Sequence, residues 1–211
     1  MLTTELVPAP DKNSRRLLIV LHGLGDSMEG YRWMPEMLRL PWLNYLLVNA
    51  PDDYYGGYSW FDFEGNPAPG ILRSREMLMA LLDSLPARGF PSGQTMLFGF
   101  SQGCVMTLDV GLRHRERLAG LIGISGDVAT PEVLVREFSP FAREVPALMT
   151  HGPADPVIPI ARARRNAQVL IDAGARLQWR EFPKAHTIAG EEELRVIAEF
   201  IQACLFPKAA S

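Results

Sequence analysis

Cysteine is scarce in this sequence of 211 residues, and the two that occur, Cys104 and Cys204, are too few for a disulfide framework. They indicate reduced thiols, as in a cytoplasmic protein. An excess of positive charge is also missing, because the formal net charge is −3. This balance argues against nucleic acid as the main partner.

Long apolar runs are absent as well, since none approaches the ~18 residues that a membrane span requires. The first ten residues hold Glu5 and two prolines without a basic stretch, which is unlike a signal peptide. We therefore expect a cytoplasmic protein without stable membrane insertion. No group of histidine, cysteine and aspartate residues has the spacing of a metal site, so we expect no metal.

Short apolar runs alternate with longer amphipathic stretches along the whole chain. The runs cover residues 17–21, 45–48, 95–98, 118–124, 147–149 and 177–182. Helical patterns lie between them, at 29–40, 71–85, 102–113, 160–173 and 191–205. Continuous apolar runs are typical of strands that are buried on both faces of a parallel sheet.

This alternation predicts an α/β fold with a mostly parallel, doubly wound sheet flanked by helices. Hydrophobic residues make up 47% of the chain, and no linker, repeat or low-complexity segment divides it. We expect one domain over residues 1–211. Ligands bind such sheets at the carboxyl ends of the strands, so functional residues should follow the apolar runs.

The motif Gly99-Phe100-Ser101-Gln102-Gly103 follows one apolar run and precedes a helical pattern. This is G-x-S-x-G between strand and helix, the context of a nucleophile elbow. The serine there adopts a strained backbone, and glycine two residues to either side avoids collisions. We predict that Ser101 is a nucleophile, against the alternative of a simple Gly/Ser turn.

A serine nucleophile requires a base, and the chain has four histidines. His186 lies between the last apolar run and the last helical pattern, so we expect it to be the base. An acid between nucleophile and base in sequence would orient that histidine. Asp155 fits best because glycine and proline flank it in a fixed loop, and Asp127 remains the alternative.

The segment Leu21-His22-Gly23-Leu24-Gly25-Asp26 follows the first strong apolar run. A loop at this place supplies one backbone N–H of an oxyanion hole, and the residue after the nucleophile supplies the other. We assign these roles to Leu24 and Gln102, with His22 and Asp26 bracing the loop. The segment lacks the Lys-Ser/Thr ending of a P-loop and the spacing of a dinucleotide fingerprint.

These motifs occur together with Ser59-Trp60-Phe61-Asp62, His151-Gly152, Asp155-Pro156-Val157-Ile158-Pro159 and Ala185-His186-Thr187-Ile188. In this order they resemble the phospholipase/carboxylesterase family of α/β hydrolases, which includes bacterial carboxylesterases and acyl-protein thioesterases. The resemblance extends from about residue 17 to 201. It departs from the family pattern at Cys104 and Ala185, where glycine is common.

The resemblance implies the α/β-hydrolase fold and hydrolysis of carboxylic esters, thioesters or lysophospholipids by Ser101, Asp155 and His186. It implies a small-molecule substrate and no cofactor. A homodimer, a lactonase or haloperoxidase activity, and a non-catalytic binding module on the same fold stay open as alternatives.

The stretch 51–70 is irregular and rich in aromatic residues, and a long loop in a compact domain is often functional. We expect Trp60 to form a wall of the acyl pocket, with Val157 and Ile158 at its edge. The segment 128–144 is short, so we expect no large lid domain and an open site for short to medium acyl groups.

Overall fold

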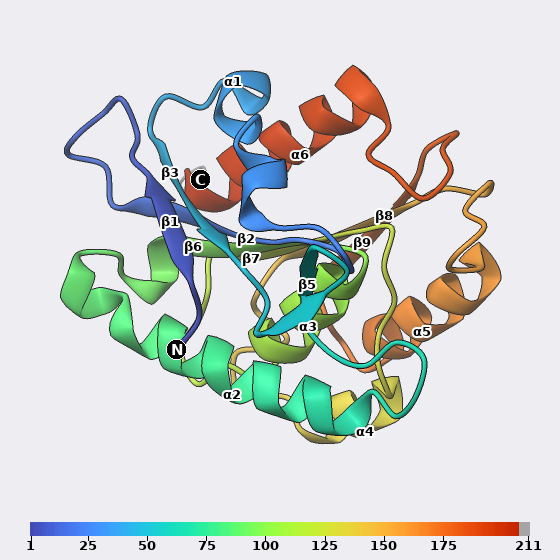
Figure 1. Ribbon diagram of the computed structural model, residues 1–211. Helices are drawn as coiled ribbons and strands as arrows, with labels where there is room; N and C mark the ends of the chain where they lie inside the picture. The colour runs from blue at the N-terminus through green and yellow to red at the C-terminus, as the bar shows by residue number, and fades with distance from the viewer. Residues whose placement is uncertain (207–211) are drawn as a thin grey trace.

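The computed structural model describes residues 1–206 and has a seven-stranded sheet at its centre (Figure 1). The strand order is β1-β3-β2-β6-β7-β8-β9, and only β1 runs antiparallel to its neighbour. The strands are β1 (Thr4–Val7), β2 (Arg16–Leu21), β3 (Leu43–Val48), β6 (Thr95–Phe100), β7 (Gly120–Ile124), β8 (Ala147–His151) and β9 (Leu177–Glu181). The predicted mostly parallel, doubly wound sheet is confirmed.

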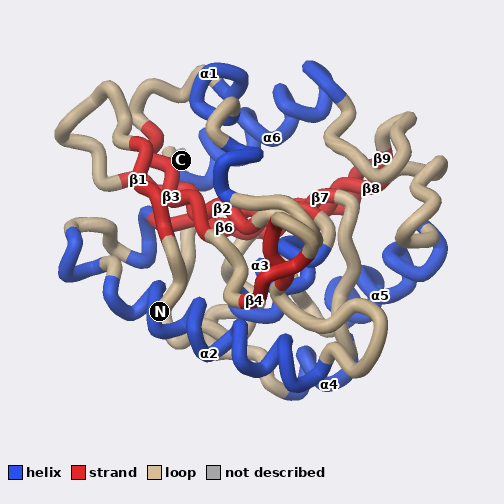
Figure 2. The backbone as a smooth tube through the Cα atoms, in the orientation of Figure 1, coloured by secondary structure: helices blue, strands red, loops and turns tan. Residues whose placement is uncertain are grey.

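Helices cover both faces of this sheet (Figure 2). In the view of Figure 1, α1 and α6 lie above the sheet, and the other four helices lie below it. The helices are α1 (Met34–Leu38), α2 (Ala68–Ser84), α3 (Gln102–Gly111), α4 (Pro131–Arg136), α5 (Ile160–Asp172) and α6 (Gly190–Leu205). Among residues 1–206 no helix has both the length and the apolar character that a membrane crossing needs.

Strand β2 shows why the apolar runs are continuous. Leu17 and Ile19 belong to the core under α2 and α3, whereas Leu18 and Val20 belong to the core under α1 and α6. Successive side chains of a strand point to opposite faces, so both sets of residues must be apolar when helices cover both faces.

The helical pattern over 29–40 forms two short pieces instead of one helix. A 3-10 turn spans Met28–Tyr31, and α1 begins only at Met34, with Pro35 in its first turn. Pro35 lacks an N–H and suits a helix start but not a helix interior. Three features were not predicted: β1, α4 and a hairpin formed by β4 (Asp52–Tyr54) and β5 (Gly57–Ser59).

The strand order predicts where a ligand binds to this sheet. β2 and β6 are neighbours, but the sheet continues from β2 to β3 on one side and from β6 to β7 on the other. At such a switch point the loops after two adjacent strands diverge and leave a crevice for a ligand. Between β7 and β8 the described chain has only the six-residue helix α4, and there is no large lid domain.

Candidate active site

Ser101 stands between β6 and α3 with a backbone φ of 53° and ψ of −115°. A positive φ is strained for a residue with a side chain, and such strain concentrates at functional sites. The sharp turn requires close backbone approaches. A Cβ atom on Gly99 would lie 2.0 Å from the carbonyl oxygen of Gly103, and one on Gly103 would lie 2.1 Å from that of Leu21. Both glycines of the motif are therefore required, as in a nucleophile elbow.

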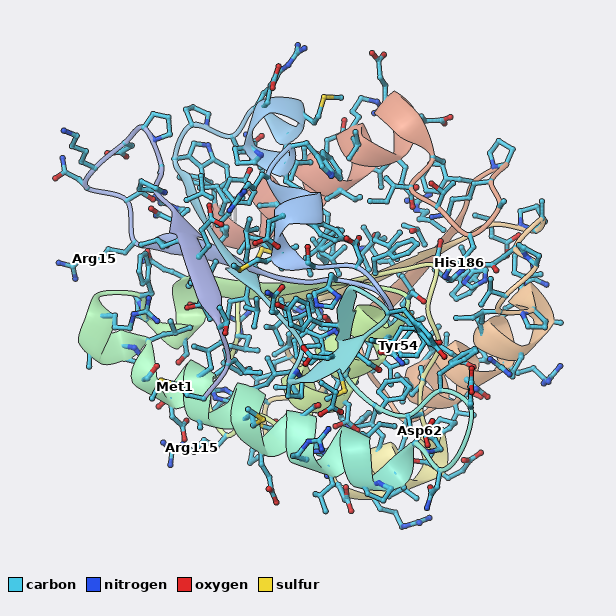
Figure 3. All side chains as sticks on the ribbon, viewed as in Figure 1. Met1, Arg15, Tyr54, Asp62, Arg115 and His186 are labelled. Atoms are coloured by element: carbon cyan, nitrogen blue, oxygen red, sulfur yellow. The ribbon has the colours of Figure 1, made fainter. Side chains whose placement is uncertain are left out.

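A chain of hydrogen bonds joins three side chains that are far apart in sequence. His186 Nε2 lies 2.9 Å from Ser101 Oγ, and His186 Nδ1 lies 2.8 Å from Asp155 Oδ2. The carboxylate can only accept, so Nδ1 carries the proton and Nε2 is free to accept the serine proton. In Figure 3 the labelled His186 lies at the right of the view, well away from Met1 and Arg15 at the left.

The carboxylate of Asp155 is fixed on both oxygens. Its Oδ1 accepts the N–H groups of Val157 and Ile158 at 2.8 and 2.9 Å, and its side chain is fully buried. Burial by itself raises the pKa of Asp155. Hydrogen bonds from the N–H group of Ile158, the His186 ring and the N–H group of Val157 lower this pKa. Their combined effect exceeds that of burial, so the pKa of Asp155 lies below its ordinary value. Asp155 is therefore held as a carboxylate that orients the histidine.

Asp127, the alternative acid, lies in a different network. Its Oδ2 accepts a hydrogen bond from Arg162 at 2.7 Å, and its Oδ1 accepts one from Asn166 at 2.9 Å. The Nδ1 atom of His186 is already bonded to Asp155. The geometry thus favours Asp155 over Asp127 as the partner of His186.

The loop after β2 faces the serine. Leu24, Ser101, Gln102 and His186 line one cavity of about 290 Å³. Within residues 1–206, the backbone N–H groups of Leu24 and Gln102 make no hydrogen bond. Two unpaired N–H groups beside a serine hydroxyl are the donors that an oxyanion hole requires.

His22 orients the first of these donors. Its Nε2 accepts the N–H of Ala50 at 3.0 Å, so its Nδ1 carries a proton and donates to the Gly23 carbonyl oxygen at 2.6 Å. The Gly23 carbonyl and the Leu24 N–H belong to the same trans peptide group and point in opposite directions. The bond to His22 therefore sets the direction of the Leu24 N–H. Burial lowers the pKa of His22, which keeps this ring neutral.

The structure corrects the interpretation of Trp60. Its side chain is fully buried, and its indole N–H donates to the carbonyl oxygen of His22 at 2.9 Å. Its backbone N–H donates to the side-chain oxygen of Gln102, also at 2.9 Å. An indole with no accessible surface cannot form the wall of a substrate pocket. Trp60 instead anchors the 51–70 segment to the loop after β2 and to the first residue of α3.

Two cavities flank Ser101, and each of the residues expected at the pocket edge, Val157 and Ile158, lines one of them. Val157 is half exposed in the 290 Å³ cavity, and Ile158 is buried beside a second cavity of about 170 Å³. Phe63 lines both cavities, and Phe100 and Val105 line one each. The sequence pattern singled out Phe63 only as one of several aromatics in the 51–70 stretch, and it did not identify Phe100 or Val105.

A larger cavity lies elsewhere in the described chain. It has a volume of about 610 Å³, is lined by Met1, Leu2 and residues of α2, and contains none of the residues around Ser101. We place the functional site at Ser101 because the reactive side chains converge there. Among residues 1–206 no group of three or more histidine, cysteine, aspartate and glutamate residues could hold a metal ion.

This geometry can be compared with known proteins. The family model described as phospholipase/carboxylesterase matches residues 2–205. An acyl-protein thioesterase 1 from Schizosaccharomyces pombe is 33% identical over 194 residues, which cover 82% of this chain and 84% of that protein. A probable carboxylesterase from Oryza sativa subsp. japonica is 30% identical, with 90% and 80% of the two chains covered.

Solved structures give the same result. Esterase PE8 superposes with a TM-score of 0.87 at 31% identity, over 97% of this chain and 99% of the other. The Bacillus cereus carboxylesterase has a TM-score of 0.82 at 16% identity, over 97% and 95% of the two chains, which supports the fold alone.

The chain belongs to the phospholipase/carboxylesterase family of α/β hydrolases. The fold, the family and the enzyme class predicted from the sequence, a hydrolase of carboxylic esters, are thereby confirmed.

Proposed function

We propose that this protein hydrolyses carboxylic esters and thioesters with short to medium acyl groups, through an acyl-enzyme formed on Ser101. The observation that carries the proposal is the hydrogen-bonded chain from Asp155 through His186 to Ser101 Oγ. A serine hydroxyl becomes an effective nucleophile when an oriented base accepts its proton.

The first half of the reaction transfers the acyl group. Ser101 Oγ attacks the substrate carbonyl carbon while its proton passes to His186 Nε2. The carbonyl oxygen becomes an oxyanion and accepts hydrogen bonds from the N–H groups of Leu24 and Gln102. His186 then gives its proton to the departing alcohol or thiol as the bond to the acyl carbon breaks.

The second half returns the free enzyme. His186 takes a proton from a water molecule, and the resulting nucleophile attacks the acyl carbon of the acyl-enzyme. The oxyanion is held by the same two N–H groups. His186 then protonates Ser101 Oγ as the acid product leaves. Asp155 stabilises the charged imidazolium in both halves without taking up a proton.

The position of His186 supports an assignment of the two cavities to the two parts of the substrate. The leaving group must lie where His186 Nε2 can protonate it, and His186 lines only the 290 Å³ cavity. The acyl group then enters the 170 Å³ cavity, which Ser101 shares with apolar residues such as Phe61, Val105 and Ile158.

The ion pair between Asp127 and Arg162 lines the same acyl cavity. Each methylene group that is buried against apolar side chains contributes ~0.8 kcal/mol of binding. A longer acyl chain that reaches the charged pair would desolvate it without compensation. The cavity therefore favours short to medium acyl groups.

The direct test is Ser101→Ala assayed with p-nitrophenyl butyrate. We expect a loss of several orders of magnitude in kcat, up to ~10⁶, because removal of one member of such a triad disables the others. An unchanged circular dichroism spectrum shows that the variant is folded. If the folded variant keeps a tenth of the activity or more, Ser101 is not the nucleophile.

A further inference from the structure

A third cavity, of about 250 Å³, adjoins the leaving-group cavity. The two share Asp26 and Phe100 among their lining residues. The third cavity extends further to Tyr31, Trp33 and Ile188. A leaving group that starts at Ser101 and passes Asp26 and Phe100 therefore reaches this second compartment.

The compartment lies on the His186 side of Ser101, which is the side that we assign to the leaving group. The ring of Phe100 is centred 5.1 Å from that of His186, and Ile188 follows two residues after that histidine. The acyl cavity contributes no residue to the compartment. What binds here is consequently the distal part of the departing alcohol or thiol.

The chemistry of the compartment is aromatic and acidic. Tyr31 and Trp33 stack with ring centroids 6.4 Å apart, and Phe100 lines the same cavity. The Asp26 carboxylate is exposed and accepts the backbone N–H of Ser27 at 2.8 Å. Within residues 1–206 Asp26 forms no ion pair.

The neighbouring charges do not neutralise this carboxylate. Arg32 is bound by Glu5 at 2.6 Å and also lies 3.9 Å from Glu29, the chain neighbour of Gly30, which lines the compartment. The acyl cavity differs, because its carboxylate, Asp127, is paired with Arg162 at 2.7 Å. The two ends of the substrate site therefore carry different charge: balanced at the acyl end and negative at the leaving-group end.

We propose that this compartment binds an alkylammonium group on the leaving alcohol or thiol, as in esters of choline. Faces of aromatic rings attract quaternary ammonium groups, and an unpaired carboxylate adds an attraction that needs no hydrogen-bond donor on the ligand. This proposal rests on the proposed function and specifies its leaving-group class.

The test compares butyrylcholine with its uncharged carbon isostere, 3,3-dimethylbutyl butyrate. The two esters share acyl group and shape, so the ratio of their kcat/KM values isolates the charge. We expect the wild-type enzyme to prefer the cationic ester by about 3- to 30-fold, the range that cation–π contacts produce. Asp26→Asn and Trp33→Leu should each bring the ratio toward one.

Asp172→Asn is the matched control, because it removes an exposed carboxylate from α5, away from all three cavities. It should leave the ratio at the wild-type value. Raising the salt concentration should lower the wild-type ratio, because exposed charges are screened. A wild-type ratio of one or below, or an Asp26→Asn ratio equal to wild type, overturns the proposal.

A binding measurement separates this proposal from the proposed function. Tetramethylammonium should bind to the Ser101→Ala variant in calorimetry, and Trp33→Leu in that background should weaken the binding several-fold. If the folded wild-type enzyme hydrolyses neither ester, the proposed function fails. Tetramethylammonium binding then still tests whether the compartment binds alkylammonium groups. If it hydrolyses the neutral ester and tetramethylammonium does not bind, only the compartment proposal fails.

Discussion

The Lys184 ammonium lies 2.6 Å from a carboxylate oxygen of Glu193, and both side chains are fully buried. The same carboxylate also accepts hydrogen bonds from the Thr150 hydroxyl and from the backbone N–H of Ala189. Lys184 and Ala189 stand on either side of His186 in the chain. One carboxylate of α6 therefore holds both ends of the short loop that carries His186.

Breaking this pair should destabilise the protein strongly. Glu193→Met or Lys184→Met leaves one buried group without its partner, at an expected cost of about 3–5 kcal/mol and roughly 6–20 °C in Tm. Lys184→Met combined with Glu193→Met should cost less than the sum of the single changes, because no unpaired charge remains. Differential scanning calorimetry of the three variants decides this, and strictly additive losses would contradict a coupled pair.

Two matched variants test whether Asp155 or Asp127 is the acid that orients His186. Asp155→Asn should lower kcat by ~10⁴, because the amide no longer favours the productive tautomer of His186. Asp127→Asn should change kcat far less, since that side chain contacts Arg162 and Asn166 and not the histidine. Steady-state kinetics on one neutral ester provide the comparison. The reverse ranking would assign the acid to Asp127.

Stability should fall on mild acidification, in part because of His22. Burial lowers the pKa of His22 in the folded protein. Below pH ~6.5 the unfolded chain takes up a proton on this residue that the folded protein resists, so acidification favours unfolding. The contribution of His22 to the free energy of unfolding is fully present above this pH. It declines as the pH falls from there toward the pKa that His22 has in the folded protein.

The measurement for His22 is urea denaturation between pH 8 and pH 5. His22→Asn retains a donor for the Gly23 carbonyl but does not titrate in this range. Its free energy of unfolding should therefore depend less steeply on pH than that of the wild-type protein, whatever its absolute value. Equal slopes for the two proteins would show that His22 is not responsible.

Chain-length selectivity should depend on Phe63 and not on Trp60. Trp60→Ala removes a fully buried side chain, which should cost about 3–5 kcal/mol of stability and leave the shape of the acyl-length profile unchanged. Phe63 is 57% exposed and lines both cavities beside Ser101, so Phe63→Ala should alter the profile with little loss of Tm. The readouts are kcat/KM for acetate to octanoate esters and thermal melting.

If Trp60→Ala shifted the preferred acyl length while Phe63→Ala did not, the assignment of the acyl cavity would be wrong. A parallel loss of activity on every ester, with a lower Tm, is the outcome expected of a buried anchor such as Trp60.

The sequence alone determined the fold class and the enzyme class, and it predicted the residues of the site. Continuous apolar runs alternating with helical patterns require a parallel sheet with both faces covered, and strand β2 meets this requirement on both faces. Local rules also predicted Ser101 as the nucleophile, because a strained turn between strand and helix permits only glycine at positions 99 and 103. His186 and Asp155 followed from their places after successive strands.

Tertiary structure decided what each side chain faces. Trp60 and Phe63 stand three residues apart in one aromatic stretch, yet one is fully buried and the other lines the substrate cavities. Asp127 and Asp155 both follow a strand, yet only one meets His186. Such differences depend on contacts between segments distant in sequence, so no local pattern of apolar or turn residues encodes them. The cavity that Asp26 and Trp33 share with Phe100 and Ile188 arises in the same way, because the three segments that carry these residues meet only in the folded chain.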